Sequence, residues 1–220
     1  PRRPEIIYVG TFHLPWKTTD GGRTWTSVHR GMIDDSDVMS ILVDRTNPAR
    51  VLASACSGIY RSDNGGALWR KVQGIPFSAR RTHVLAQDSE HASVIYAGTT
   101  EGLWQSEDAG ATWRRVTPAD WVINSVEVPV SRPGRVVIGT ADLGVLVSDD
   151  RGQHFRAANQ GFNHQRTLAL ALDPDRAGRV LAVVANGPEP LLVTDDGGLN
   201  WKPLGKGFSD SRGQLLRVYA

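Results

Sequence analysis

A short phrase recurs five times in this chain at almost constant spacing. Its pattern is [Ser/Thr]-x-Asp-x-Gly-x-x-aromatic, with one Asn in place of Asp and one Phe in place of Trp. The closing aromatics follow one another at steps of 44, 44, 42 and 46 residues. A period of this length, built only from short strands, is typical of a β-propeller or a β-array. The five copies are Thr18–Trp25, Ser62–Trp69, Ser106–Trp113, Ser148–Phe155 and Thr194–Trp201.

Each constant position of the phrase has a mechanical role in a β-hairpin turn. The short acid or amide side chain accepts backbone N–H bonds from the turn that follows it. The Gly three residues before the aromatic supplies a backbone with positive φ, and the aromatic packs its apolar face under the hairpin. The predicted structural residues are therefore Asp20, Asn64, Asp108, Asp150 and Asp196, with the aromatics Trp25, Trp69, Trp113, Phe155 and Trp201.

The residues upstream of each phrase also repeat, and they predict four strands per unit. Runs rich in Val, Ile, Leu and aromatics are bounded by Gly, Pro, Asp and Asn, and no stretch shows a sustained helical period. The predicted inner strands are Val38–Val43, His83–Gln87, Ile123–Val128 and Thr167–Leu172. The predicted second strands are Ile6–Val9, Val51–Ser54, Val94–Ala97, Val136–Ile138 and Val180–Val184. The predicted third strands are Pro15–Thr18, Ile59–Ser62, Leu103–Ser106, Val145–Ser148 and Leu191–Thr194.

The two ends of the chain predict how the array closes. The chain begins at a second strand, so the first unit lacks an inner strand, and Gln214–Ala220 is apolar and strand-like. We therefore predict an all-β fold, a five-bladed β-propeller of four-stranded antiparallel blades, in which the C-terminal strand completes the first blade and removes the exposed edges. The alternative is a fragment of a larger ring. The whole chain, 1–220, would form one domain with blades at about 1–30 plus 213–220, 36–74, 81–117, 121–158 and 165–204.

Composition narrows the classes of function. The chain is 40% hydrophobic and 22% charged, as expected of a compact domain, and no apolar run approaches the length needed to span a membrane. Its one cysteine excludes an internal disulfide and a cysteine-cluster metal site. A net charge of +2 is weak for non-specific nucleic-acid binding. Of the 25 basic residues 21 are Arg, which suits carboxylate recognition and protein interfaces, and suits a GC-rich genome as well.

The repeated phrase resembles the Asp-box, or BNR repeat, of sialidases, some glycoside hydrolases, sortilin-type receptors and photosystem II stability/assembly factor-like proteins. The resemblance covers essentially the whole chain and is closest to the bacterial assembly factor-like group, in Gly58–Ser62, Tyr96–Trp104 and Leu172–Pro174. It implies the propeller fold strongly and the function weakly, because the Asp-box of that family lies away from the active centre. It implies a scaffold module that binds a protein partner, including one in a membrane-associated complex. Because Asp-box proteins are often exported, it also implies a periplasmic or secreted location.

The enzyme hypotheses rest on few residues. A sialidase needs a Tyr nucleophile, but Tyr8 and Tyr96 occupy one slot of the repeat, and residues that recur in every blade are there to pack blades together. A glycoside hydrolase needs two carboxylates a few ångströms apart. The candidates lie in loops between second and third strands, and ordinary solvated acids are the alternative interpretation. They are Glu101, Asp142 and Glu189.

The loops between a fourth strand and the next inner strand differ from unit to unit. Variable loops on a rigid scaffold are where binding residues concentrate, and propeller topology places these loops on the same face as the three acids. Aromatic and Arg side chains suit both protein interfaces and sugar platforms. The alternatives are a solvated Arg pair and a Trp that packs in the core. Phe77 is expected on the same face. The predicted binding residues are Arg80, Arg81, Trp121, Phe162, His164, Arg166, Phe208 and Arg212.

No metal or cofactor is predicted, because the spacing of His13, His83 and His164 shows no ligand pattern. The sequence as a whole favours a non-catalytic Asp-box propeller that binds a protein or supports an assembly. The alternative is a carbohydrate-active protein, lectin-like or a glycoside hydrolase, that uses the loop-rich face of the ring.

Overall fold

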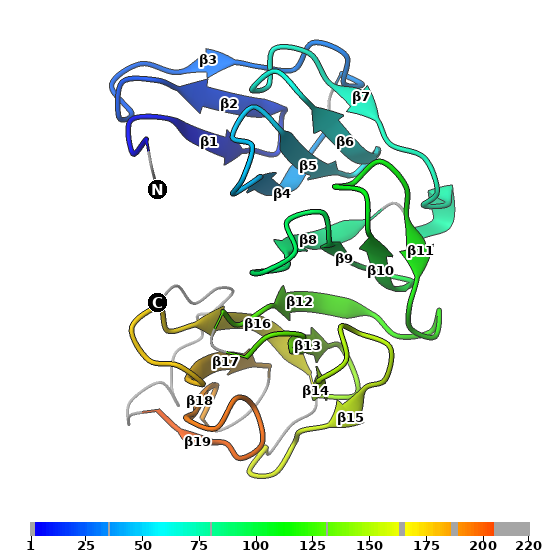
Figure 1. Ribbon diagram of the computed structural model, residues 1–220, viewed down its shortest axis with the longest axis vertical. Helices are drawn as coiled ribbons and strands as arrows, with labels where there is room; N and C mark the ends of the chain where they lie inside the picture. The colour runs from blue at the N-terminus through cyan, green and yellow to red at the C-terminus, as the bar shows by residue number, and fades with distance from the viewer. Residues whose placement is uncertain are drawn as a thin grey trace. The chain divides into compact units, whose positions relative to one another are not determined.

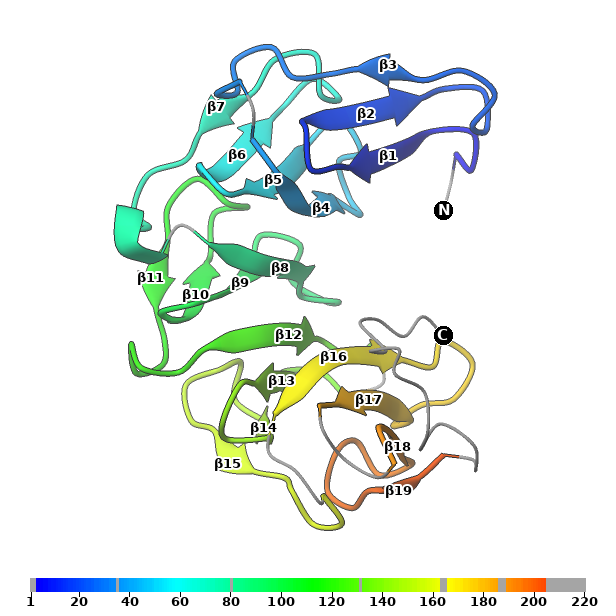
Figure 2. The same cartoon turned by 180° about the vertical axis from the view of Figure 1, so that it is seen from behind.

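The computed structural model describes residues 3–34, 36–79, 81–130, 132–162, 166–185 and 189–204. Within these ranges the chain is all-β, apart from the single 3₁₀ turn η1 (Phe77–Ala79). Its strands form one sheet of three strands and four sheets of four, and each strand pairs with the next along the chain (Figures 1 and 2). No helix of the described residues is long and apolar enough to cross a membrane.

The first sheet contains β1 (Ile7–Gly10), β2 (Pro15–Thr18) and β3 (Thr26–Ser27). The second contains β4 (Val38–Val43), β5 (Val51–Ala55), β6 (Gly58–Ser62) and β7 (Arg70–Lys71). The third contains β8 (Thr82–Gln87), β9 (Ile95–Thr99), β10 (Gly102–Ser106) and β11 (Arg114–Arg115). The fourth contains β12 (Ile123–Glu127), β13 (Val136–Thr140), β14 (Val145–Ser148) and β15 (Arg156–Ala157). The fifth contains β16 (Thr167–Leu172), β17 (Val180–Val184), β18 (Leu191–Thr194) and β19 (Lys202–Pro203).

The strands agree with the sequence-based expectations to within two residues at each end. Strands β2, β4, β14, β16, β17 and β18 have the predicted bounds. The last strand of each sheet is only two residues long. Most of the segment after the preceding strand belongs to the turn phrase. The first sheet has three described strands, and the segment predicted to complete it, Gln214–Ala220, lies outside the described residues.

A β-bulge interrupts the start of each of the four inner strands. The register shifts after the first residue of β4, β8, β12 and β16, so one extra residue is inserted at the same place in each sheet. A bulge bends its strand and re-aims a side chain. The inserted residues are Met39, His83, Asn124 and Leu168. The four sheets therefore repeat even this irregularity, which β-strand propensity alone does not predict.

The described chain forms two compact units, and the division between them runs through the third sheet. Among the described residues, unit 1 lies within 3–87, 91–99 and 104–114, and unit 2 lies within 88–90, 100–103 and 115–204. In unit 1 one core cluster surrounds Tyr60 and Trp69, and another contains Leu52, Trp104 and Trp113. In unit 2 the core contains Val137, Val147, Leu170 and Trp201. Each cluster draws its side chains from more than one sheet, so the sheets of a unit bury one another's faces.

The five turn phrases share one hydrogen-bond pattern. The hydroxyl at the first position donates to the acid or amide oxygen two residues later, and it accepts the backbone N–H four residues later. The acid or amide oxygen accepts the backbone N–H four residues beyond itself. Two consecutive residues have positive φ in every copy, including the non-glycine residues Ala109 and Arg151. These local bonds make the turn conformation largely independent of its surroundings.

The turn aromatics also join neighbouring sheets. The indole nitrogen of Trp69 donates to the carbonyl of Val28, which follows β3, the last strand of the first sheet, at 2.7 Å. The indole nitrogen of Trp201 donates in the same way to Ala158, at 2.8 Å. Trp69 and Trp201 are buried, whereas Trp25 of the first turn is 38% exposed, and among the described residues its indole nitrogen bonds to the carbonyl of Gly22 in its own turn.

Candidate functional site

The strand pattern gives every sheet two different ends. The turn phrases and the loops between inner and second strands lie at one end, here called the turn side. The loops between second and third strands and those that lead to the next inner strand lie at the other end, here called the loop side. Backbone bonds join the two kinds of loop on the loop side, for example Cys56 N–H to the carbonyl of Asp37 and Ala185 N–H to the carbonyl of Arg166.

The loops of two predicted acids bond to the backbone at Trp121 and Val122 on the loop side of unit 2. The N–H of Gly102, which follows Glu101, donates to the carbonyl of Trp121 at 2.8 Å. The N–H of Ala141, which precedes Asp142, donates to the carbonyl of Val122 at 3.0 Å. Glu101 is half-buried and Asp142 is exposed. The backbone therefore brings the loops of these two acids to two consecutive residues, Trp121 and Val122.

The predicted aromatic residues of unit 2 make packing contacts. Trp121 is half-buried, and its ring meets that of Phe155 edge to face with centroids 6.3 Å apart. Phe162 is also half-buried, and its ring meets that of Trp201 in the same way at 5.1 Å. Such pairs stabilise the packing beyond the area that they bury. Both predicted binding residues therefore contribute to the packing of turn aromatics as well as to the loop-side surface.

The remaining predicted residues fall into two groups. Arg81 in unit 1 and Arg166 in unit 2 are exposed beside the first residues of β8 and β16, and Glu189 is half-buried in the loop before β18. The others lie outside the described residues, namely Arg80, His164, Phe208 and Arg212.

Three exposed apolar side chains lie on the loop side of unit 1, and sequence analysis missed two of them, Phe12 and Ile33. Phe12 is 90% exposed, Phe77 71% and Ile33 56%. Phe12 lies between β1 and β2, whereas Ile33 and Phe77 lie in loops that lead to the next inner strand. Each of them is a large apolar residue within a loop, and this was the signal that the sequence offered. Where exposed apolar side chains lie together on a surface, they mark an interaction site.

The acids of the turn side serve the fold. Hydrogen bonds from the Thr24 and Thr18 side chains and the Thr24 backbone lower the pKa of Asp20 well below its usual range. At Asp108, burial acts to raise the pKa, but hydrogen bonds from the Thr112 side chain and backbone outweigh it and lower the pKa to about 2. The pKa of Asp150 is lowered by the backbone N–H of His154 and the Ser148 hydroxyl. At Asp196 burial acts to raise the pKa, but hydrogen bonds from Thr194 and Asn200 outweigh it and lower the pKa. Carboxylates held ionised in this way are poor proton donors near neutral pH.

A consequence for stability can be measured at Asp108. Its folded-state pKa of about 2 lies below the ordinary value of 3.8, so its contribution is present above about pH 4 and is lost as the pH falls towards 2. The substitution Asp108→Asn should therefore flatten the decline of the unfolding free energy between pH 4 and pH 2, as measured by urea denaturation. The variant should fold, because Asn64 makes the same backbone bond in the second turn. Equal slopes for both proteins would contradict this assignment.

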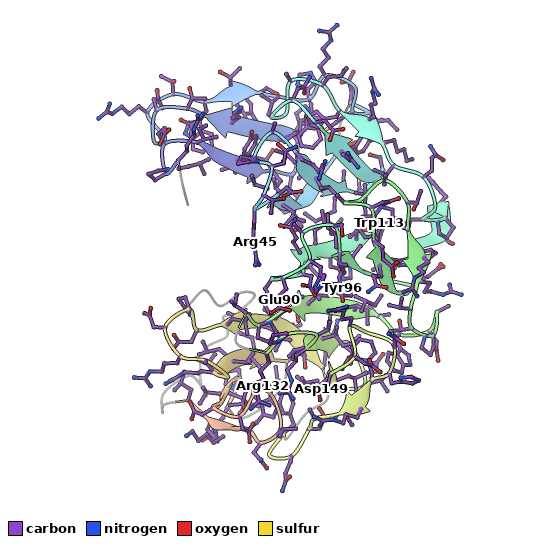
Figure 3. The ribbon with its side chains drawn as sticks, in the orientation of Figure 1. Arg45, Glu90, Tyr96, Trp113, Arg132 and Asp149 are labelled. Atoms are coloured by element: carbon purple, nitrogen blue, oxygen red, sulfur yellow. The ribbon has the colours of Figure 1, made fainter. Side chains whose placement is uncertain are left out.

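A second feature that sequence analysis missed is an ion pair repeated on the turn side. An acid at the second position of the phrase bonds a base seven residues later in three copies. The pairs are Glu107 with Arg114 at 3.0 Å, Asp149 with Arg156 at 3.2 Å and Asp195 with Lys202 at 2.9 Å. Asp149, labelled in Figure 3, also accepts a bond from the buried Arg135. The constant spacing of seven residues was the available signal.

Metal ligation was also considered. Among the residues that the structure describes, no three His, Cys, Asp or Glu side chains are grouped so that they could hold an ion.

Comparison with known proteins identifies the fold. No protein-family model matches the sequence, and no curated protein matches it. An ancestral GH74 enzyme superposes with a TM-score of 0.75 at 18% identity, over 92% of this chain and 32% of its own. A GH74 xyloglucanase from Xanthomonas campestris gives 0.71 at 21%, over 90% and 36%. YCF48 from Cyanidioschyzon merolae gives 0.57 at 14%, over 79% and 57%.

These likenesses show a β-propeller fold. At such low identity they show nothing further. The chain spans about a third of the length of the GH74 enzymes that it matches.

Proposed function

We propose that this chain is a non-catalytic Asp-box propeller module that binds a protein partner through its loop side. The observation that carries the proposal is the exposure of Phe12, Ile33 and Phe77 on the loop side of unit 1, together with exposed Arg81. Aromatic and Arg side chains are enriched in protein interfaces, where each supplies a large contact area. The turn-side acids support a non-catalytic role, because their oxygens are occupied by the turns that they stabilise.

The proposal includes the closed form of the ring. We propose that the five sheets are the blades of one five-bladed propeller and that Gln214–Ala220 supplies the inner strand of the first blade. Two observations support closure. The first sheet has three described strands where the other four have four. Trp25 is also 38% exposed, whereas Trp69, Trp113 and Trp201 are buried.

A capture experiment with matched variants tests the binding proposal. The purified chain should retain a stoichiometric protein partner from the lysate of its native organism. Retention should fall at least about tenfold in a Phe12→Ser, Phe77→Ser double variant, because hot-spot aromatics each contribute roughly 1–2 kcal/mol or more. The control is Val130→Ser, which removes an apolar side chain that is likewise 71% exposed but lies on the turn side. Equal losses in both variants, or no partner at all, would refute the proposal.

A second candidate function has its own observation. The loops of Glu101 and Asp142 bond to neighbouring residues, Trp121 and Val122, and a pair of carboxylates brought near each other is what a glycoside-hydrolysing site uses. The GH74 structures that share the fold are consistent with this alternative. A glycan array run with the same protein tests it. Glycan binding that is lost in Trp121→Ala and unchanged in the Phe12, Phe77 variant would favour the carbohydrate hypothesis.

A further inference from the structure

The second turn departs from the other four at two positions. Asn64 stands where the other copies have Asp, so the turn lacks that negative charge. Leu68 stands where the other copies have Thr, His or Asn, whose side chains bond the second carboxylate oxygen. The oxygen of Asn64 accepts the N–H of Leu68 at 2.9 Å, but its amide nitrogen has no hydrogen-bond partner among the described residues.

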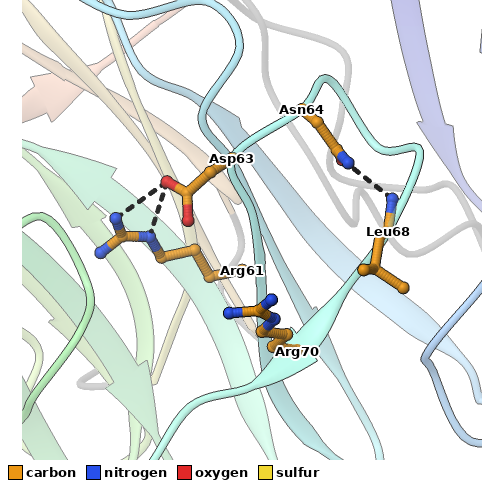
Figure 4. A pocket seen from close by; sticks show the side chains of 5 residues that line it. All are labelled: Arg61, Asp63, Asn64, Leu68 and Arg70. Atoms are coloured by element: carbon orange, nitrogen blue, oxygen red, sulfur yellow. Dashed lines mark hydrogen bonds and ion pairs between the residues drawn. The ribbon is translucent and has the colours of Figure 1, made fainter.

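A pocket of about 160 Å³ lies beside this turn, entirely within unit 1 (Figure 4). Asn64 and Leu68 line it from the turn, and Arg61 and Arg70 line it from strands β6 and β7. Asp63 completes the lining. The volume is that of roughly five waters, which is enough for a side-chain carboxylate and the methylenes that carry it.

The two arginines are direct neighbours. Arg61 and Arg70 are partners in the register of β6 and β7, so both side chains lie on the same face of the sheet. Like charges placed opposite each other are unfavourable unless an anion compensates them. In the fourth and fifth sheets the basic residue of the last strand is paired with a neutral residue instead. Arg156 is the register partner of Val147, and Lys202 is the register partner of Val193.

The carboxylate of Asp63 compensates the charge of only one of these two arginines, Arg61. Asp63 accepts bonds from Arg61 at 2.8 Å and from Arg50 at 3.3 Å, which holds its pKa below the usual value although burial acts to raise it. Arg61 is further tied to the carbonyl of Ala109 at 3.2 Å. Arg70 is exposed and makes no hydrogen bond or ion pair to the described residues, in contrast to the equivalent bases Arg114, Arg156 and Lys202.

We propose that this pocket binds a carboxylate side chain from an acidic segment of a partner protein. The guanidinium of Arg70 offers a planar fork that matches a carboxylate, and the amide nitrogen of Asn64 offers a further donor. The apolar side chain of Leu68, 36% exposed, covers the methylenes next to the bound group. The carboxylate of Asp63 in the lining disfavours a dianion such as phosphate. This site lies on the turn side and is independent of the loop-side function proposed above.

The experiment is an NMR titration of the full chain with hexaglutamate, hexaglutamine or inorganic phosphate. Hexaglutamate should shift the backbone amide signals of Asn64 and Leu68. Its Kd should rise about fivefold or more in Arg70→Gln and in Asn64→Asp, an effect on the order of one surface charge pair. Asn64→Asp gives the second turn the residue that the other four contain, so its melting temperature should not fall. The control Arg114→Gln, at the equivalent position of the third sheet, should leave the Kd within about twofold.

Each alternative outcome would overturn the proposal. Equal shifts with hexaglutamine would show that the peptide binds without its carboxylates. Shifts with phosphate and none with hexaglutamate would assign the pocket to an inorganic anion. An unchanged Kd in both pocket variants, or an equal loss in Arg114→Gln, would place the binding elsewhere on the molecule.

Discussion

Replacing Trp69 with alanine should lower the free energy of unfolding by about 4 kcal/mol, the usual loss when a fully buried aromatic leaves a cavity. Trp69 is 1% exposed, belongs to a core cluster of unit 1 and bonds to the carbonyl of Val28 at the end of the preceding sheet. The variant therefore removes both packing and the link between two sheets. Guanidinium denaturation followed by far-UV circular dichroism measures the loss.

The neighbouring residue provides the control for this experiment. Leu68 is 36% exposed, so Leu68→Ala should cost only about 1 kcal/mol. A loss at Trp69 that is no larger than the loss at Leu68 would show that the repeated aromatic does not hold the sheets together.

The same exchange at Trp25 tests closure of the ring. In the described structure Trp25 is 38% exposed, and partial burial predicts a loss of about 2 kcal/mol for Trp25→Ala. Closure would place the end of the fifth sheet against Trp25, as Val28 lies against Trp69, and would raise the loss to about 4 kcal/mol. A value near that of Trp69→Ala is expected, and the smaller value would argue against closure.

The second large effect is expected at Gly31, where Gly31→Ala should cost about 3 kcal/mol. Gly31 has a φ of 91°, and a Cβ there would lie 2.2 Å from the carbonyl oxygen of Trp69. That oxygen belongs to the backbone of the next sheet, so the two sheets would have to separate. Left-handed strain and a backbone clash therefore act together.

The substitution Gly21→Ala separates the cost of the left-handed strain from the cost of the backbone clash. The φ of Gly21 is 72°, and a Cβ there would meet nothing within 4 Å, so Gly21→Ala should cost only the strain of about 1 kcal/mol. The difference between the two variants measures how closely the sheets approach one another. Equal losses of unfolding free energy in Gly31→Ala and Gly21→Ala would mean that the two sheets move apart at Gly31 without a measurable cost.

Much of the fold could be predicted from the sequence because its determinants are local. The hydroxyl, the acid and the left-handed residues of each turn lie within eight residues of one another, and their bonds form within that span. Strand ends followed from the turn residues that flank them, as with β4 and β16. The bulges at Met39 and His83 could not be predicted, because they depend on how an inner strand pairs with its neighbour.

The candidate sites were less predictable because they combine segments far apart in the sequence. The three acids were identified by their loops, but the bonds that bring the loops of Glu101 and Asp142 to Trp121 and Val122 join different strands. The exposure of Phe12 and Ile33 was not apparent, since an apolar residue in a loop can equally be buried. Their surroundings are set by the packing of whole sheets.

The sequence by itself determined the repeat, the turns, the strand order and therefore the class of fold, since these depend on residues close together in the chain. Only the tertiary structure decided which members of a repeated set differ in environment. It buries Trp69 and exposes Trp25, and it pairs Arg114 with Glu107 while Arg70 stays unpaired among the described residues. The physical reason is that burial and ion pairing depend on distances between sheets, which a repeating sequence pattern does not contain.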